Sequence, residues 1–222
     1  MLPQASQHVS LIINAGGDSR RMGAPKALLP VPPNNIPLLQ HMLERLSPLG
    51  WQRIIVVAND LTLPQQVHHP ADVQFIADAY PGMGALGGIA TGLEQGAEWA
   101  LVIATDMPLI NPKLCAWLCQ QTLIDQDQPG TPAPFDVIMP IVDGKLQPLH
   151  ALYHVRTLAA IRAQLAQGER MIIRFLTDVR TRTVTAAEMQ LIDPGLHSFV
   201  NVNTPEEWVT AQQLMRDEAS QS

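Results

Sequence analysis

Short apolar runs that are not broken by charged residues are the feature that most restricts the fold of this chain. Val9–Asn14, Arg53–Ala58 and Trp99–Ala104 read VSLIIN, RIIVVA and WALVIA. A strand that is apolar on both faces has to be covered on both, which is typical of parallel sheets flanked by helices. Between these runs, Pro37–Leu49 has apolar residues at helical spacing, and Gly88–Gln95 also predicts a helix. The alternation therefore predicts an α/β fold with a mostly parallel sheet and helices on both faces.

The second half of the chain predicts a more mixed arrangement. After a short third strand at 73–76 in the first half, strands are expected near 136–139 and 149–153, and a helix near 155–165. Asn111 and Pro112 predict a capped helix start, and Thr204–Glu207 is a capping box before a final helix that ends near Met215. Asp125–Pro134 is polar and rich in proline, but too short for a domain linker. We expect one Rossmann-like domain over residues 1–222, with its core between about 9 and 215.

Composition excludes several classes of function. A net charge of −6 argues against a general nucleic-acid binder, which needs a basic face. The first ten residues do not resemble a signal peptide and no apolar run is long enough to span a bilayer, so we expect a cytoplasmic protein without a membrane partner. Cys115 and Cys119 are four apart on a predicted helix, with no third metal ligand nearby. Two buried thiols explain them better than a zinc site.

The turn after the first strand has the composition of a phosphate-binding loop. Ala15–Lys26 reads AGGDSRRMGAPK and directly follows Asn14. Glycines let backbone N–H groups approach phosphate oxygens, and Arg20, Arg21 and Lys26 supply positive charge. The spacing fits neither a Walker A loop nor a dinucleotide fingerprint. The alternative is a tight turn with solvated basic residues.

Asp106 is the strongest candidate for a metal ligand. It follows the predicted strand Trp99–Ala104, at the edge of the sheet where α/β proteins bind their ligands. Mg²⁺ prefers oxygen ligands and often takes one or two carboxylates together with substrate phosphates. Asp106 could instead cap the following helix, but Asn111 is better placed for that role.

A second glycine-rich segment offers a competing interpretation. Gly82–Gly87 satisfies G-x-G-x-x-G, and Asp106 follows at the spacing of a nicotinamide-dinucleotide site. That fingerprint needs a direct turn from strand to helix, whereas Asp78–Pro81 lies between them here. It also leaves the loop after Asn14 unexplained, so we disfavour a dinucleotide site.

Several segments together resemble the molybdenum cofactor guanylyltransferases, a family of GT-A-like nucleotidyltransferases. The loop from Ala15 continues as K-A-L-L, Asp106-Met107-Pro108 resembles the family's metal-binding D-x-P, and Gly84–Gly88 resembles its G-P-L-A-G segment. F-V-N-V-N-T-P-E-E at 199–207 is a specific match, and Gly168-Glu169-Arg170 resembles its G-E-R turn. Pro25 departs from the family, which usually has Asp there, and P-K-A-L-L-P is closer to the related molybdopterin cytidylyltransferases. Gly17 favours guanine, because it leaves room for a purine.

The resemblance implies a role for each matching residue. The nucleotide would be bound by the following residues: Asn14, Ala15, Gly16, Gly17, Lys26, Asn59, Asp78, Gly84 and Asp106. Asp106 would hold Mg²⁺, while Lys26 with Arg20 or Arg21 would offset the negative charge of the reaction. Asn201 and Asn203, expected on one face of an extended segment, would shape the site. Arg170 and Arg174, expected four apart on one helix, would grip the acceptor's phosphate; solvated surface arginines are the alternative.

The reaction implied is transfer of GMP from GTP to the terminal phosphate of molybdopterin, with or without its molybdenum, and release of pyrophosphate. Other proteins of molybdenum-cofactor biosynthesis, or proteins that accept the product, would be its partners. Three other functions stay open. They are a molybdopterin cytidylyltransferase, a sugar-1-phosphate nucleotidylyltransferase that shares the loop and the aspartate, and a nucleotide-binding module without catalysis.

Overall fold

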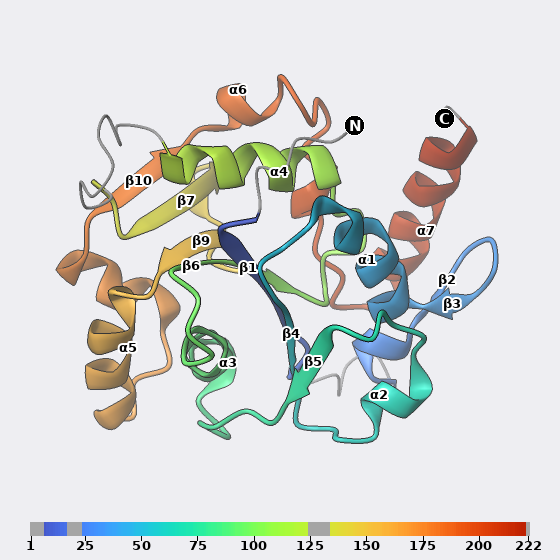
Figure 1. Cartoon of the computed structure of the whole chain (residues 1–222). Helices are drawn as coiled ribbons and strands as arrows, with labels where there is room; N and C mark the ends of the chain where they lie inside the picture. The colour runs from blue at the N-terminus through green and yellow to red at the C-terminus, as the bar shows by residue number, and fades with distance from the viewer. Residues whose placement is uncertain (1–6, 17–23, 124–133, 221–222) are drawn as a thin grey trace.

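A central mixed sheet confirms the predicted α/β fold (Figure 1). The computed structural model describes residues 7–16, 24–123 and 134–220, with side chains up to residue 217. The strands of the main sheet are β1 (Val9–Asn14), β4 (Ile54–Val57), β5 (Val73–Ile76), β6 (Trp99–Ala104), β7 (Val137–Val142), β8 (Lys145–Leu146), β9 (His150–His154) and β10 (Thr181–Val184). A separate hairpin pairs β2 (Pro30–Val31) with β3 (Ile36–Pro37).

The sheet has the order β10-β7-β9-β6-β1-β4-β5, and β8 pairs with β7. β6, β1, β4 and β5 are parallel, whereas β9 runs antiparallel to both β6 and β7. Asn14, the last residue of β1, pairs with Val57 of β4 and with Ala104 of β6. The carboxyl ends of three neighbouring strands are therefore level with one another, on either side of the point where the chain order reverses.

Helices cover both faces of this sheet (Figure 1). α1 (Leu38–Leu46) and α4 (Pro112–Gln120) pack on one face, together with the buried side of α7 (Pro205–Ser220). α3 (Gly84–Leu93) and α5 (Thr157–Ala166) pack on the other. The shorter elements are α2 (Leu63–Gln66), α6 (Ala186–Met189) and the 3₁₀ helices Lys26–Leu28, Ser47–Leu49, Gln121–Leu123, Ile172–Asp178 and His197–Phe199.

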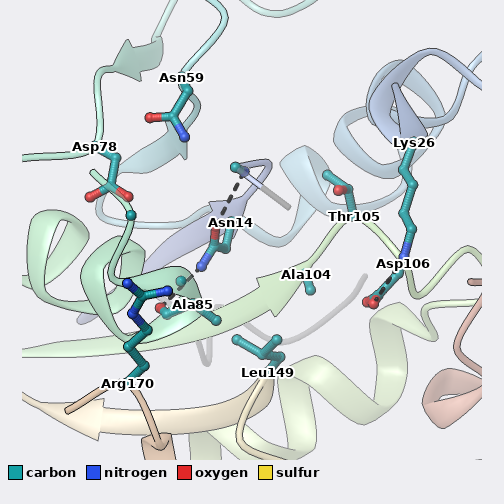
Figure 2. A pocket seen from close by; sticks show the side chains of 13 residues that line it. Asn14, Lys26, Asn59, Asp78, Ala85, Ala104, Thr105, Asp106, Leu149 and Arg170 are labelled. Carbon is teal, nitrogen blue, oxygen red and sulfur yellow. Dashed lines mark hydrogen bonds and ion pairs between the residues drawn. The ribbon is translucent and has the colours of Figure 1, made fainter. Parts of the chain in front are cut away.

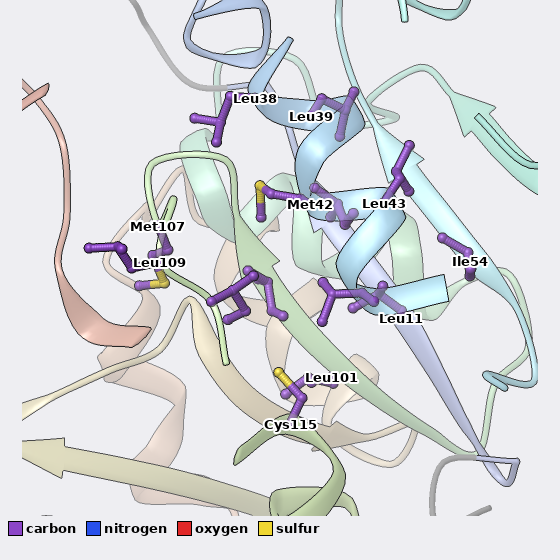
Figure 3. Close-up of a cluster of buried hydrophobic side chains, with 14 of the residues drawn as sticks. Leu11, Leu38, Leu39, Met42, Leu43, Ile54, Leu101, Met107, Leu109 and Cys115 are labelled. Atoms are coloured by element: carbon purple, nitrogen blue, oxygen red, sulfur yellow. The ribbon is translucent and has the colours of Figure 1, made fainter. Parts of the chain in front are cut away.

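Successive side chains of the central strand β1 pack into two different hydrophobic cores, one on each face of the sheet. Leu11 and Ile13 of β1 pack on the α1 side, where Figure 3 shows Leu11 beside the leucines of α1, and Ile12 packs on the α3 side. All three are completely buried, as the uninterrupted apolar run predicts. Cys115 and Cys119 of α4 are free, buried thiols, which confirms that they are core residues.

Both predicted helix starts are confirmed. The Asn111 side chain accepts hydrogen bonds from the N–H groups of Lys113 and Leu114. Thr204 and Glu207 form the reciprocal bonds of a capping box. Within the part of the chain that the structure describes, no helix is both long and apolar enough to cross a bilayer.

Two local predictions are wrong. α3 begins at Gly84, four residues before the expected Gly88, because small residues at 84, 85 and 88 conceal the helical period. Arg170 and Arg174 do not share a helix: Arg170 precedes the 3₁₀ helix Ile172–Asp178, which contains Arg174. The Glu169 carboxylate accepts the N–H groups of Arg170 and Met171 and so holds them in a turn outside the helix.

Candidate active site

Residues from four strand ends surround one cavity of about 480 Å³ (Figure 2). Its wall includes Asn14 at the end of β1, Asn59 after β4, Asp78 after β5 and Asp106 after β6. The remaining lining residues are Gly16, Lys26, Gly82, Gly84, Ala85, Ala104, Thr105, Leu149 and Arg170. The cavity has the size of a small-molecule site and lies at the carboxyl edge of the parallel strands, as the sequence predicts.

Asn14 ties the loop after β1 to the start of α3. Its Oδ1 accepts the Gly16 N–H at 3.3 Å, and its Nδ2 donates to the Ala85 carbonyl at 3.2 Å. A Cβ atom on Gly88 would lie 2.4 Å from Asn14 Nδ2, a distance that side-chain carbons do not adopt. Gly88 therefore lets α3 approach β1 closely enough for Asn14 to join both segments.

Lys26, Asp106 and Asn203 form a polar cluster at the opposite wall. Lys26 Nζ donates to Asn203 Oδ1 at 2.7 Å and lies 3.5 Å from Asp106 Oδ2. The Asp106 carbonyl also accepts the Val202 N–H at 2.8 Å, which holds the Asn203 segment beside the end of β6. The hydrogen bond between Lys26 and Asn203 joins residues 177 positions apart in the sequence. Figure 2 shows the Lys26 side chain extending to Asp106.

The carboxylate of Asp106 has the properties expected of a ligand for a hard cation. Its Oδ1 is buried and has no hydrogen-bond partner within the described structure. A buried carboxylate oxygen in that state is costly unless something binds to it. Among the described residues, no three His, Cys, Asp or Glu side chains cluster as a metal site. The donor set therefore fits Mg²⁺ that takes its other ligands from phosphates and water.

Asp78 and Arg170 both line the side of the cavity that lies away from Lys26 (Figure 2). Arg170 is exposed and makes no side-chain hydrogen bond or ion pair with another described residue. Arg174 differs, since its Nη1 pairs with Glu169 Oε2 at 2.8 Å and it does not line the cavity. Of these two arginines, Arg170 is the one that is placed to meet an anionic ligand in this cavity.

The structure brings together most of the residues predicted for the site. Ala15 lines an adjoining recess of about 300 Å³, which shares Gly16, Lys26, Asn59 and Thr105 with the main cavity. Asn201 does not line the cavity: its Nδ2 donates to the Phe199 carbonyl at 3.3 Å. Three further predicted residues, Gly17, Arg20 and Arg21, lie outside the described residues.

Sequence reasoning did not identify Thr105, Leu149 or Gly88 as part of the site. Thr105 and Leu149 line the cavity, and Gly88 supports it. The spacing of Gly84, Gly88 and Gly92 was an available signal, because residues four apart on a helix share a face. A Cβ on Gly92 would lie 2.5 Å from the Ile12 side chain, so Gly88 and Gly92 mark the face that packs against β1, whereas a Cβ on Gly84 would meet nothing within 4 Å.

The fold and cavity define an α/β protein with a candidate small-molecule site at the carboxyl edge of its sheet. Residues 11–182 match the model of the MobA-like NTP transferase domain, and the chain belongs to that family. This confirms the group of nucleotidyltransferases that the motifs predicted.

Similar proteins agree with this assignment over most of the chain. A probable molybdenum cofactor guanylyltransferase of Chloroflexus aggregans is 36% identical over 203 residues, covering 90% of this chain and 91% of that protein. One of Bacillus cereus strain G9842 is 30% identical over 210 residues, covering 93% and 97%. The crystal structure of molybdopterin-guanine dinucleotide biosynthesis protein A from Archaeoglobus fulgidus has a TM-score of 0.76 at 24% identity, covering 94% of this chain and all of that one. This last likeness supports the fold.

Proposed function

We propose that this chain is a Mg²⁺-dependent molybdenum cofactor guanylyltransferase. It transfers GMP from GTP to the terminal phosphate of molybdopterin and releases pyrophosphate. The observation that carries the proposal is the buried, unpartnered Asp106 Oδ1 beside Lys26, in the same cavity as the Asn14–Gly16 turn. The names of the relatives that are 36% and 30% identical support the choice of reaction.

The arrangement of side chains suggests how the chain promotes this transfer. A phosphate oxygen of the acceptor attacks the α-phosphorus of GTP, and the bond to the β-phosphate oxygen breaks as pyrophosphate leaves. The loop after β1 positions the phosphates through its N–H groups, and Lys26 offsets the negative charge that grows on them. Arg170 enters the cavity from the segment after α5 and is placed to bind the anionic acceptor. The described residues that line the cavity include no Cys, Ser or His, and we propose direct transfer without a covalent intermediate.

Asp106 Oδ1 and Asn203 Oδ1 are the oxygens that would hold Mg²⁺ in this site. Bound there, the ion would neutralise phosphate charge and orient the reacting groups. Because Lys26 now contacts both residues, its side chain has to turn toward the phosphates when the substrate and ion enter.

The identity of the base is the finer part of the proposal. Pro25 is shared with the cytidylyltransferase pattern, whereas the relatives above are named as guanylyltransferases. Pyrophosphate release should be measured with each of the four nucleoside triphosphates, with Mg²⁺ and molybdenum cofactor present. We expect GTP to give the highest kcat/KM. Preference for CTP would overturn the guanine assignment, and absence of turnover with all four would favour a binding module.

A further inference from the structure

We propose that Thr91 is a positioning residue that fixes the Asp78 carboxylate for nucleotide binding. Asp78 lines the cavity from the connection between β5 and α3, whereas Thr91 is buried in α3, at 2% exposure. No sequence motif links the two residues. The inference rests on the proposed function, because it assumes that the ligand of Asp78 is a nucleotide.

The hydroxyl of Thr91 is held in one orientation by two hydrogen bonds. The Ala79 N–H donates to Thr91 Oγ1 at 3.0 Å, and Thr91 Oγ1 donates to Asp78 Oδ1 at 3.0 Å. An amide N–H can only donate, so the hydroxyl accepts from it and directs its own proton to the carboxylate. One side chain thereby fixes both the backbone and the acid of this turn.

The hydrogen bonds leave the two Asp78 oxygens in different states. Oδ1 also accepts the Tyr80 N–H at 2.9 Å, which gives it two donors. Oδ2 accepts no hydrogen bond from any residue in the described ranges. Oδ2 is then the oxygen that remains for donors on a ligand, such as the hydroxyl or amino groups of a nucleoside.

The surrounding contacts lock this turn against α3. A Cβ on Gly87 would lie 2.8 Å from the Tyr80 carbonyl and 3.2 Å from Asp78 Oδ1, so this face of α3 has no room for a side chain. The Tyr80 hydroxyl donates to Glu94, the residue that follows α3, and Arg162 of α5 pairs with the same carboxylate. The turn therefore keeps its Tyr80–Glu94 anchor when the bond from the Ala79 N–H to Thr91 is lost, so removal of the Thr91 hydroxyl should mainly free the Asp78 side chain.

The test is direct binding of GTP, measured by calorimetry with Mg²⁺ and without acceptor. We expect Thr91→Val to raise the Kd about 10-fold, since a hydrogen bond to a carboxylate is lost. In turnover, the KM for GTP should rise with little change in kcat. Thr91→Ser keeps the hydroxyl and should bind within about 2-fold of the unaltered protein. Thr91→Ala is measured too, in case the valine packs badly.

A double-mutant cycle separates positioning from general destabilisation. If Thr91 acts through Asp78, adding Thr91→Val to Asp78→Asn should weaken binding no further. Independent, additive losses would overturn the inference, and so would wild-type affinity in both Thr91→Val and Thr91→Ala. Thr157→Val is the matched control, because Thr157 is a buried threonine of α5 whose hydroxyl donates to the His154 carbonyl at 2.8 Å. If the unaltered protein binds no GTP at all, the proposed function fails instead.

Discussion

Two aspartates at opposite ends of the strands show what separates a binding site from a structural ion pair in this protein. Asp106 follows β6 and has one buried oxygen that no described residue hydrogen-bonds. Asp136 precedes β7 and is the more buried of the two, with a side chain 11% exposed against 22% for Asp106, but both of its oxygens accept hydrogen bonds. Oδ1 accepts from Arg156 Nε at 2.8 Å and Arg180 Nη2 at 3.2 Å, and Oδ2 accepts from the Arg180 N–H at 2.9 Å and Nε at 3.1 Å.

The difference teaches that unsatisfied hydrogen-bonding capacity, rather than charge, marks the site. Burial raises the pKa of the Asp136 carboxyl, but the hydrogen bonds from Arg180 and Arg156 outweigh that effect and hold the pKa well below its usual range. Asp136 thus stabilises the fold and has no oxygen left for a ligand. Asp106 has Lys26 near its Oδ2, and no described residue hydrogen-bonds its Oδ1, which is therefore available to a ligand.

Asp106→Asn should have the largest effect on turnover. The substitution keeps the shape of the side chain but removes the charge that a divalent cation needs, so kcat should fall by about 1000-fold. Pyrophosphate release as a function of Mg²⁺ concentration measures this. The melting temperature should change little, since Asp106 Oδ1 makes no bond that the fold loses. Near-normal Mg²⁺-dependent turnover would show that the two aspartates do not differ as described.

Lys26→Ala should lower kcat/KM for GTP by about 100-fold. Its ammonium contacts Asp106 and Asn203 and is the described cation nearest to the proposed metal site. Initial rates at several GTP concentrations distinguish a loss of binding from a loss of kcat. Lys113→Ala, on the first turn of α4, is a control that should behave like the unaltered protein. An unchanged kcat/KM for Lys26→Ala would remove this residue from the mechanism.

Asp136→Asn should affect stability and not turnover. We expect the free energy of unfolding to fall by about 2 kcal/mol, the range for hydrogen bonds to charged groups. Urea denaturation followed by circular dichroism measures it, while kcat at 25 °C should be unchanged.

The pH dependence of the free energy of unfolding, compared between the unaltered protein and Asp136→Asn, tests the same ion pairs. Because the folded pKa of Asp136 lies below its ordinary value of 3.8, its contribution is fully present above that value and is lost as pH falls through the folded pKa. The difference in free energy of unfolding between the unaltered protein and Asp136→Asn should therefore be constant at pH 5–7 and decrease below about pH 4. A gap that is independent of pH would contradict the assigned pairing.

Among the substitutions of cavity residues, Arg170→Ala should have the smallest effect on turnover, an increase of about 10-fold in the KM for the acceptor with the KM for GTP unchanged. Arg170 lines the cavity without a partner among the described residues, so it can pair with the acceptor's phosphate. Arg174→Ala is the matched control, because Arg174 pairs with Glu169 outside the cavity. Equal effects of the two substitutions would contradict the placement of the acceptor.

Much of the fold could be predicted because the periodicity of the chain is local. β1, β5 and β6 begin and end at the predicted residues, and Asn111 and Thr204 cap the predicted helices. Asp106 was identifiable because it directly follows a buried strand, and such positions converge at one edge of a parallel sheet. Arg170 and Arg174 were misplaced because the Glu169 turn delays the helix, and its side-chain bonds leave no periodic signal.

The sequence by itself therefore determined the alternation of strands and helices, the single carboxylate after β6 and the family. Only the tertiary structure decided that β9 lies antiparallel beside β6, that Asn203 contacts Lys26, that Thr91 holds Asp78, and that Asp136 is saturated by arginines. The reason is physical. Periodicity and capping act over a few residues, whereas these contacts join distant segments and exist only once the packed sheet brings them together.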